Sequence, residues 1–167
     1  WYASANLYYM RYINQFVMTG AKSDIGEAIT SNIKNSFRLG AELSAGWSPL
    51  QWLSLEGNAA LSQNKLKNFT EEVEAWDTEA VHNTYAKSTL SYSPSAILNG
   101  FVDVHFGGFS ATWHTNFVSR QYLDNTESSE RSIPSYSQTD LAFNYTSKVS
   151  KALGMKQVTL GLSLKHN

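Results

Sequence analysis

Residues 36–47, SFRLGAELSAGW, alternate between apolar and polar side chains without interruption. The apolar set is Phe37, Leu39, Ala41, Leu43, Ala45 and Trp47, and the polar set is Ser36, Arg38, Gly40, Glu42, Ser44 and Gly46. A period of two predicts a β-strand with one apolar and one polar face. The apolar face could pack on a protein core or contact lipid, and the rest of the sequence bears on that choice.

The same alternation predicts seven strands along the chain. We expect them at residues 3–18, 34–47, 52–66, 95–106, 109–121, 136–148 and 157–166. The phase of the first strand is ambiguous. We expect Tyr8, Met10 and Tyr12 to face outward and Arg11 inward, because a charge on an apolar face is costly.

The predicted connections alternate in length. Residues 19–32, 67–94 and 122–135 are long, whereas 48–51 and the Gly107–Gly108 hairpin are short and 149–156 is intermediate. All three prolines are expected in connections. In an up-and-down arrangement the three long connections then lie at one end, which is typical of outer-membrane barrels.

Composition excludes several classes of protein. A net charge of −1 gives no nucleic-acid footprint, and the absence of cysteine excludes disulfides and thiolate metal sites. No apolar run reaches the ~20 residues of a membrane helix. That does not argue against a membrane barrel, whose alternating strands keep the mean hydropathy modest.

The choice between a soluble β-sandwich and a membrane barrel rests on strand length and on the polar face. Several strands reach 12 residues or more, whereas strands of soluble proteins usually have about 5–6. Aromatic residues flank the short turns, as in an interfacial girdle: Trp47, Trp52, Phe106 and Phe109. We therefore predict an all-β fold, an antiparallel transmembrane β-barrel that is incomplete, with about seven consecutive strands of a larger barrel. Because seven strands cannot close such a barrel, at least one more strand is expected outside this sequence.

The alternation assigns side chains to two environments. The residues expected to face the lumen are Arg38, Glu42, Glu56, Asn58, Asp103, His105, His114, Asn116 and Asp140. The residues expected to face lipid are Phe37, Leu39, Leu43, Leu55, Leu61, Val102, Val104, Trp113, Leu160 and Leu162.

No catalytic constellation is found, so we expect no enzyme and no cofactor. His105 and His114 share a face, but the hairpin register pairs His105 with Ser110 and Phe101 with His114, which separates the histidines by about 13 Å along the strands. No metal site is expected. The acidic stretch 71–79 is read as a solvated loop. Candidate ligand contacts in the long loops are Trp76, His82, Tyr85, Tyr122, Asp124 and Arg131.

Residues 117–145, FVSRQYLDNTESSERSIPSYSQTDLAFNY, resemble the penultimate extracellular loop and flanking strands of TonB-dependent outer-membrane receptors. NLYYMRYINQFVMTG, SFRLGAEL, SYSPSAI and LGLSLKHN resemble other parts of that barrel in the same order. The resemblance implies that residues 1–167 are a partial C-terminal region of a 22-stranded barrel. The family's plug domain is absent from this sequence.

The resemblance further implies a multi-pass barrel in the Gram-negative outer membrane that takes up a scarce solute, such as an iron–siderophore, haem or cobalamin, with energy from TonB. Its implied partners are the rest of the barrel, the plug, the TonB complex through the missing N-terminal part, a small-molecule ligand and outer-membrane lipid, but no nucleic acid. Two alternatives stay open: a structural subunit of an outer-membrane assembly, and a soluble carbohydrate-binding β-sandwich.

Overall fold

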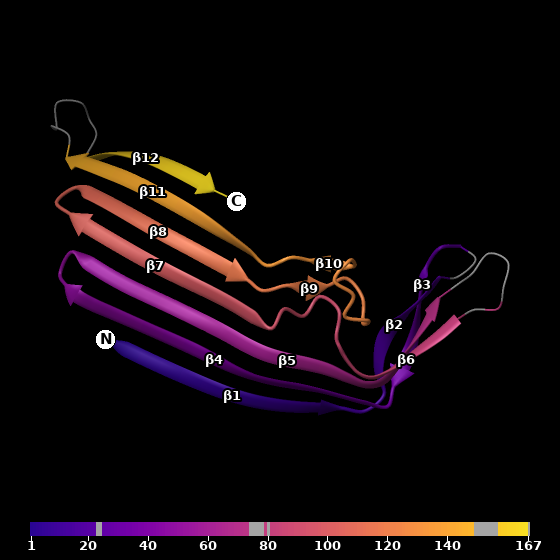
Figure 1. Ribbon diagram of the computed structural model, residues 1–167. Coiled ribbons are helices and arrows are strands. Elements are labelled where there is room, and N and C mark those ends of the chain that lie inside the picture. Colours follow the sequence, from indigo (N-terminus) through magenta and orange to yellow (C-terminus); the bar gives the residue numbers. More distant parts are fainter. Residues whose placement is uncertain (23–24, 74–78, 80, 149–156, 167) are drawn as a thin grey trace.

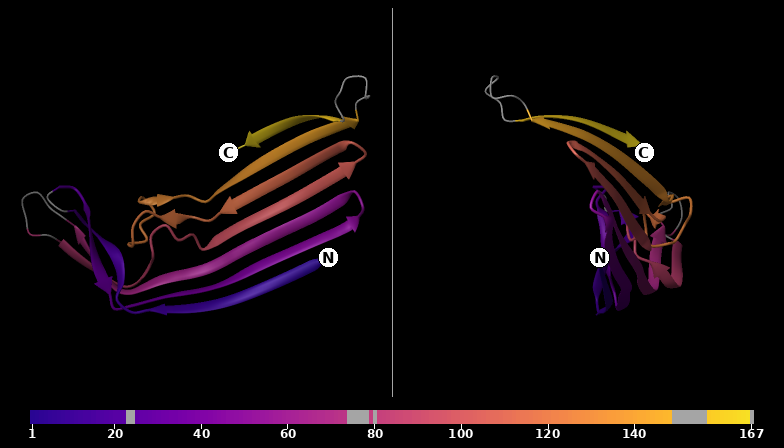
Figure 2. Two further views of the ribbon diagram at one scale, coloured as in Figure 1. Left: turned by 180° about the vertical axis from the view of Figure 1, so that it is seen from behind. Right: turned by 90° about the vertical axis from the view of Figure 1, so that its left-hand side faces the viewer.

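Seven long strands form one antiparallel, curved sheet in a computed structural model that describes residues 1–22, 25–73, 79, 81–148 and 157–166 (Figures 1 and 2). In order across the sheet they are β1 (Tyr2–Tyr12), β4 (Asn35–Leu50), β5 (Leu53–Val73), β7 (Ala96–Phe106), β8 (Phe109–Val118), β11 (Tyr136–Lys148) and β12 (Gln157–His166). Their existence confirms the seven predicted strands. The described residues include no helix that could cross a membrane.

The apolar face of this sheet is not covered by a second large sheet within the described residues. The two additional sheets have two strands each and lie at the end of the long connections. A β-sandwich requires two sheets packed face to face. The described residues therefore do not have the architecture of the β-sandwich that was kept as an alternative.

The long connections lie at one end of the sheet, as predicted, but they are more regular than expected (Figure 1). β2 (Gln15–Lys22) and β3 (Ala28–Ile33) form a hairpin, β6 (Val81–Thr89) pairs with the outer part of β5, and β9 (Gln121–Tyr122) pairs with β10 (Ser132–Ile133). The first predicted strand ends at Tyr12 instead of residue 18, because the chain turns at Asn14, whose φ is 57°. Asparagine tolerates this left-handed conformation better than most residues.

The short connections lie at the opposite end (Figure 1). Phe106 pairs with Phe109 across Gly107 and Gly108, and Gly107 has the positive φ, 59°, that a type II′ turn requires at its first central residue. Pro49 lies inside β4, not in a connection as predicted. It is tolerated there because the register between Trp47 and Leu50 is irregular, so its missing N–H breaks no regular ladder.

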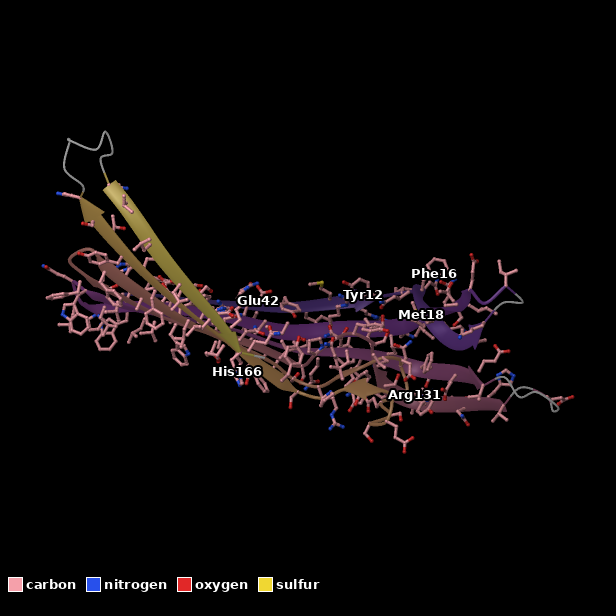
Figure 3. All side chains as sticks on the ribbon, turned by 90° about the horizontal axis from the view of Figure 1, so that it is seen from above. Tyr12, Phe16, Met18, Glu42, Arg131 and His166 are labelled. Carbon is pink, nitrogen blue, oxygen red and sulfur yellow. The ribbon has the colours of Figure 1, made fainter. Side chains whose placement is uncertain are left out.

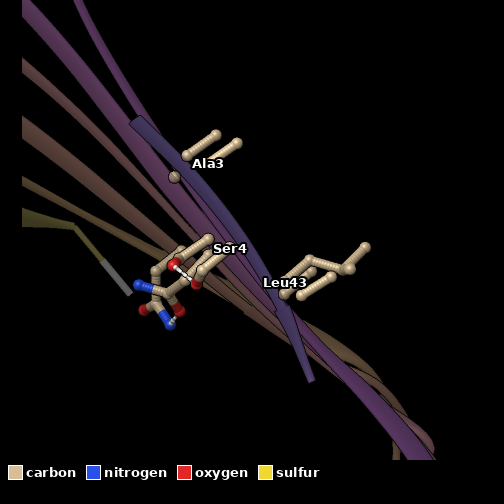
Figure 4. A pocket seen from close by; sticks show the side chains of 10 residues that line it. Ala3, Ser4 and Leu43 are labelled. Carbon is tan, nitrogen blue, oxygen red and sulfur yellow. Dashed lines mark hydrogen bonds between the residues drawn. The ribbon is translucent and has the colours of Figure 1, made fainter. Parts of the chain in front are cut away.

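The register divides the strands into an apolar and a polar face. Figure 4 shows Ala3 and Leu43 on one side of the ribbon and Ser4 on the other. In β1 the predicted phase is wrong, because Arg11 pairs with Phe37 while Tyr8 pairs with Gly40. The apolar set of β1 is Ala3, Ala5, Leu7 and Tyr9, with Arg11 at its outer end.

The only buried hydrophobic cluster that the described residues form lies under the long loops. It consists of Val17, Ile33, Leu66 and Phe69. Leu66 and Phe69 are three residues apart, yet both are buried, and Asn68 between them adopts a φ of 53°. We call the seven-stranded sheet the wall. On its apolar face, by contrast, Leu39, Leu43, Trp113 and Leu162 are exposed. The loops are therefore held by a protein core, whereas the apolar face of the wall is not covered by described residues. So large an exposed apolar surface indicates contact with something other than water.

Candidate functional site

The polar face carries every residue predicted to face the lumen. Each pairs in register with a residue of the same face, as Asp140 does with His114 and Asp103 with Thr112. The residues predicted to face lipid all lie on the opposite face, where Leu55 pairs with Val102 and Val102 with Trp113. The register thus groups the two sets as expected, and the water or lipid that each face meets stays a prediction.

A row of amides crosses the polar face between three strands. Asn99 Nδ2 on β7 donates to Asn58 Oδ1 at 2.8 Å, and Asn116 Nδ2 on β8 donates to Asn99 Oδ1 at 2.9 Å. On β1, Asn6 Nδ2 donates to Glu42 Oε2 at 3.1 Å. Asn6 and Asn99 were not among the predicted site residues, although the period of two already places Asn99 on this face.

The two histidines of the polar face are held by different neighbours. The register confirms the predicted pairs, His105 with Ser110 and Phe101 with His114. The His114 ring stacks on Phe101 with centroids 4.3 Å apart, and its Nδ1 lies 3.7 Å from Asp140 Oδ2. No group of three or more potential metal ligands gathers anywhere in the described ranges.

A hollow of about 410 Å³ lies on the polar face next to the long connections. Its lining includes Tyr8, Arg38 and Glu42 from the wall and Pro94 from the segment before β7. The Arg38 guanidinium lies 5.4 Å from the Tyr12 ring centroid. Its Nε is buried and has no hydrogen-bond partner among the described residues.

A second polar centre, which we call the loop junction, consists of Glu71, Tyr85, Asp124, Asn125 and Arg131. Arg131 Nη2 lies 2.9 Å from Glu71 Oε1, and its Nε lies 2.9 Å from Asp124 Oδ2. Tyr85 donates its hydroxyl to the other Glu71 oxygen at 3.1 Å. Figure 3 shows Arg131 at the loop end of the sheet, beyond Glu42.

Asn125 fixes the loop between β8 and β11 to two other segments. Its side chain is 1 % exposed. The Ser91 amide donates to Asn125 Oδ1 at 2.8 Å, and Asn125 Nδ2 donates to the Met18 carbonyl at 3.1 Å. Three connections that are distant in sequence are therefore tied together at one point.

The electrostatics of the junction follow from this burial. Desolvation and the hydrogen bond to Glu71 raise the pKa of the Tyr85 hydroxyl, which stays neutral at physiological pH. Desolvation opposes the charge on Arg131, but the hydrogen bond to Glu71 and the charge of Asp124 outweigh it and raise its pKa. Arg131 therefore keeps its positive charge beside Glu71 and Asp124.

A neighbouring contact responds to acid. Burial opposes ionisation of Glu127, but hydrogen bonds from Lys65, at 2.6 Å, and from Thr89 lower the pKa of its carboxyl. Because this pKa is lower in the folded state, the contact stabilises the fold above the ordinary carboxyl pKa. Its contribution is lost as the pH falls through the lowered value.

The predicted ligand contacts divide into three groups. Tyr85, Asp124 and Arg131 are brought together, but their polar groups are engaged inside the loop junction. His82 is exposed on β6, and Tyr122 is half-buried on β9. Trp76 lies outside the described residues.

Sequence reasoning missed the two residues that organise this region. Glu71, assigned to a solvated loop, is 4 % exposed and ion-paired, and Asn125 was not singled out. The signal for Glu71 is the spacing in NFTEEV, where Phe69, Glu71 and Val73 continue a period of two beyond the predicted end of the strand.

Replacing Arg131 by glutamine is expected to loosen the loops without unfolding the wall. The change leaves the buried Glu71 carboxylate without its cation. Since Arg131 is half exposed, we expect a cost of about 1 kcal/mol instead of the larger values of fully buried pairs. Amide hydrogen exchange in 81–89 and 121–133 should then rise roughly fivefold.

The matched control is Arg120→Gln, which removes an exposed arginine for which no ion pair is found among the described residues. Its exchange should equal that of the unchanged protein. Equal exchange in both variants would contradict the role of Arg131 as a fastener of the loops.

Comparison with known proteins agrees with this geometry. A family model described as "TonB dependent receptor-like, beta-barrel" matches residues 1–165. No curated protein matches the chain. The open sheet is therefore an incomplete antiparallel transmembrane β-barrel, with its long connections at one end and its short turns at the other.

Proposed function

Because the chain belongs to the TonB-dependent receptor β-barrel family, we propose that it forms wall, lumen surface and outer loops of a receptor that imports a scarce solute. Members of this family are outer-membrane receptors and transporters, and they work with a plug domain and with TonB. The solute class that we propose is an iron–siderophore, haem or cobalamin, taken up across the outer membrane of a Gram-negative cell.

The observation that carries the proposal is the hollow at Arg38. It opens on the polar face, beneath the connections, and Arg38 is one of its lining residues. A guanidinium forms strong hydrogen bonds with the carboxylate and other anionic oxygens that such solutes carry. We propose that the solute passes Arg38 after the plug has moved.

In this proposal the long connections bind the solute before it enters the barrel. Since Tyr85, Asp124 and Arg131 are engaged with one another, they hold the shape of the loops instead of contacting solute. The exposed His82 and the partly accessible Tyr122 are the proposed contacts. Together these residues bind and guide, and they perform no bond chemistry.

The test measures solute binding and uptake by the full-length protein in cells with and without TonB. A ferric siderophore, haemin and cyanocobalamin serve as labelled probes. One of them should bind in both strains but accumulate only when TonB is present. In the Arg38→Gln variant we expect uptake to fall about tenfold, as for loss of a charge-assisted hydrogen bond, with binding at the loops unchanged.

The control is Lys148→Gln, at the short-turn end of β11, which should leave uptake unchanged. Binding of none of the probes, together with stoichiometric copurification of other outer-membrane proteins, would instead identify a structural subunit of an assembly. Uptake that is independent of TonB would overturn energised import.

A further inference from the structure

Three cationic side chains converge on the apolar face, at its loop end. Lys67 Nζ lies 5.9 Å and Lys87 Nζ 5.7 Å from the centroid of the Phe37 ring. Arg11 is the register partner of Phe37, and its Nη2 donates to Asn35 Oδ1 at 3.1 Å. We call Arg11, Lys67 and Lys87 the basic cluster.

The cluster is not neutralised within the described part of the chain. Lys67 and Lys87 are direct register partners, an arrangement of like charges that is destabilising by itself. None of the three cations forms an ion pair with a described carboxylate, whereas the neighbouring Lys65 is paired with Glu127 at 2.6 Å. Three converging cations without a counter-charge are the electrostatic signature of an anion site.

The position of the cluster along the strand identifies the kind of anion. Trp47 and Phe37 lie on the apolar face of β4, ten residues apart, which corresponds to about 33 Å along the strand. With a tilt of about 40° this spans roughly 25 Å, the height of the apolar band of a membrane barrel between its two aromatic girdles. Tyr9, stacked on Phe37 with centroids 6.2 Å apart, belongs to the same outer girdle. The cations therefore lie at the level of the lipid headgroups.

The site has room for a small anionic group. A hollow of about 270 Å³ is lined by Tyr9, Arg11, Asn35, Phe37 and Lys67, among others. Cation and aromatic surfaces meet there, so a molecule with a charged head and an apolar body would contact both.

We propose that the basic cluster binds the phosphate group of an outer-leaflet lipid, whose acyl chains lie along the apolar face below Phe37 and Tyr9. The inference rests on the proposed orientation of the barrel, with its long connections outside the cell. It adds a lipid site to the outer wall, separate from the path of the solute through the lumen.

The test uses the full-length protein in a neutral detergent, titrated with short-chain phosphatidic acid, short-chain phosphatidylcholine and inorganic phosphate, with binding measured by native mass spectrometry and calorimetry. Phosphatidic acid should bind at least about tenfold more tightly than phosphatidylcholine, because its phosphate is not masked by a cation. The variant Arg11→Gln, Lys67→Gln, Lys87→Gln should lose this preference, and Lys67→Arg should retain it.

A matched control, Arg120→Gln, Lys148→Gln, Lys165→Gln, removes the same charge elsewhere and should bind lipid as the unchanged protein does. Equal binding of phosphatidic acid to both triple variants would overturn the proposal, as would inorganic phosphate that binds as tightly as the lipid. Solute uptake measured in parallel separates this failure from failure of the proposed function, because the basic-cluster variant should import solute normally.

Discussion

Replacing Leu43 by arginine should lower the free energy of unfolding of the full-length barrel in a bilayer by about 2–4 kcal/mol, the cost of a lipid-facing arginine near the midplane. Leu43 lies on the apolar face between Ala5 and Ala59, neither of which could neutralise the charge. Guanidinium titration of the protein refolded into vesicles, followed by tryptophan fluorescence, measures the difference.

The adjacent residue provides the control. Ser44 lies on the polar face, where its hydroxyl is 2.7 Å from that of Ser4 (Figure 4). Ser44→Arg should cost less than about 1 kcal/mol, since its guanidinium can reach water, and Leu43→Met should be close to neutral. If the two arginine variants were equally stable, the assignment of the apolar face to lipid would be wrong.

Replacing Gly40 by alanine should destabilise the barrel by about 1–3 kcal/mol, as expected for an overpacked site. A Cβ at this position would lie 2.5 Å from Tyr8 Cζ and 2.7 Å from the Leu61 carbonyl oxygen. Tyr8 and Gly40 are register partners, so the ring occupies the space that the missing side chain leaves. The same titration in vesicles measures the loss.

Gly57→Ala is the matched control, because its Cβ would meet only the Asn99 carbonyl oxygen, at an ordinary 3.5 Å. That variant should stay within about 0.5 kcal/mol of the parent. The double variant Tyr8→Ala, Gly40→Ala should recover part of the loss but not all of it, since the Leu61 oxygen remains. A double variant that is no more stable than Gly40→Ala would show that the Tyr8 ring is not the obstacle.

The strands of the wall were predictable because the same alternation of apolar and polar residues applies along all of them. Each strand divides its residues between two environments, so an alternation such as that of residues 36–47 determines both the strand and its faces. The register of β7 and β8 followed from a two-residue turn. The long strands and alternating connections then favoured a barrel, and the family match supports that choice.

The prediction of which β1 side chains lie on the apolar face was wrong for a local reason. The prediction assumed that an arginine at position 11 of the apolar face would be surrounded by apolar groups. Arg11 instead lies at the outer end of that face, beside Lys67. Tyr8, meanwhile, packs over Gly40, a contact between strands that hydropathy alone does not contain. The position of a residue along the strand decides the cost of a charge as much as the face it occupies.

The structure of the long connections was not predicted because it depends on contacts between residues that are distant in sequence. β6 extends the sheet only because β5 continues to Val73, and the loop between β8 and β11 is held by Asn125 contacts to Met18 and Ser91. Composition predicts polar loops equally well with or without such partners. The junction of Glu71 and Arg131, separated by 60 residues, therefore could not be derived from local pattern.

β5 runs for 21 residues as one strand, paired with β7 along its inner part and with β6 along its outer part. The outer β5–β6 hairpin on this side of the barrel is thus a direct continuation of the wall. Folding the β5–β6 hairpin over the mouth would break ladder hydrogen bonds and open the core around Phe69. In the proposed receptor, this part of the entrance therefore has a fixed aperture, and the timing of solute entry is assigned to components inside the barrel.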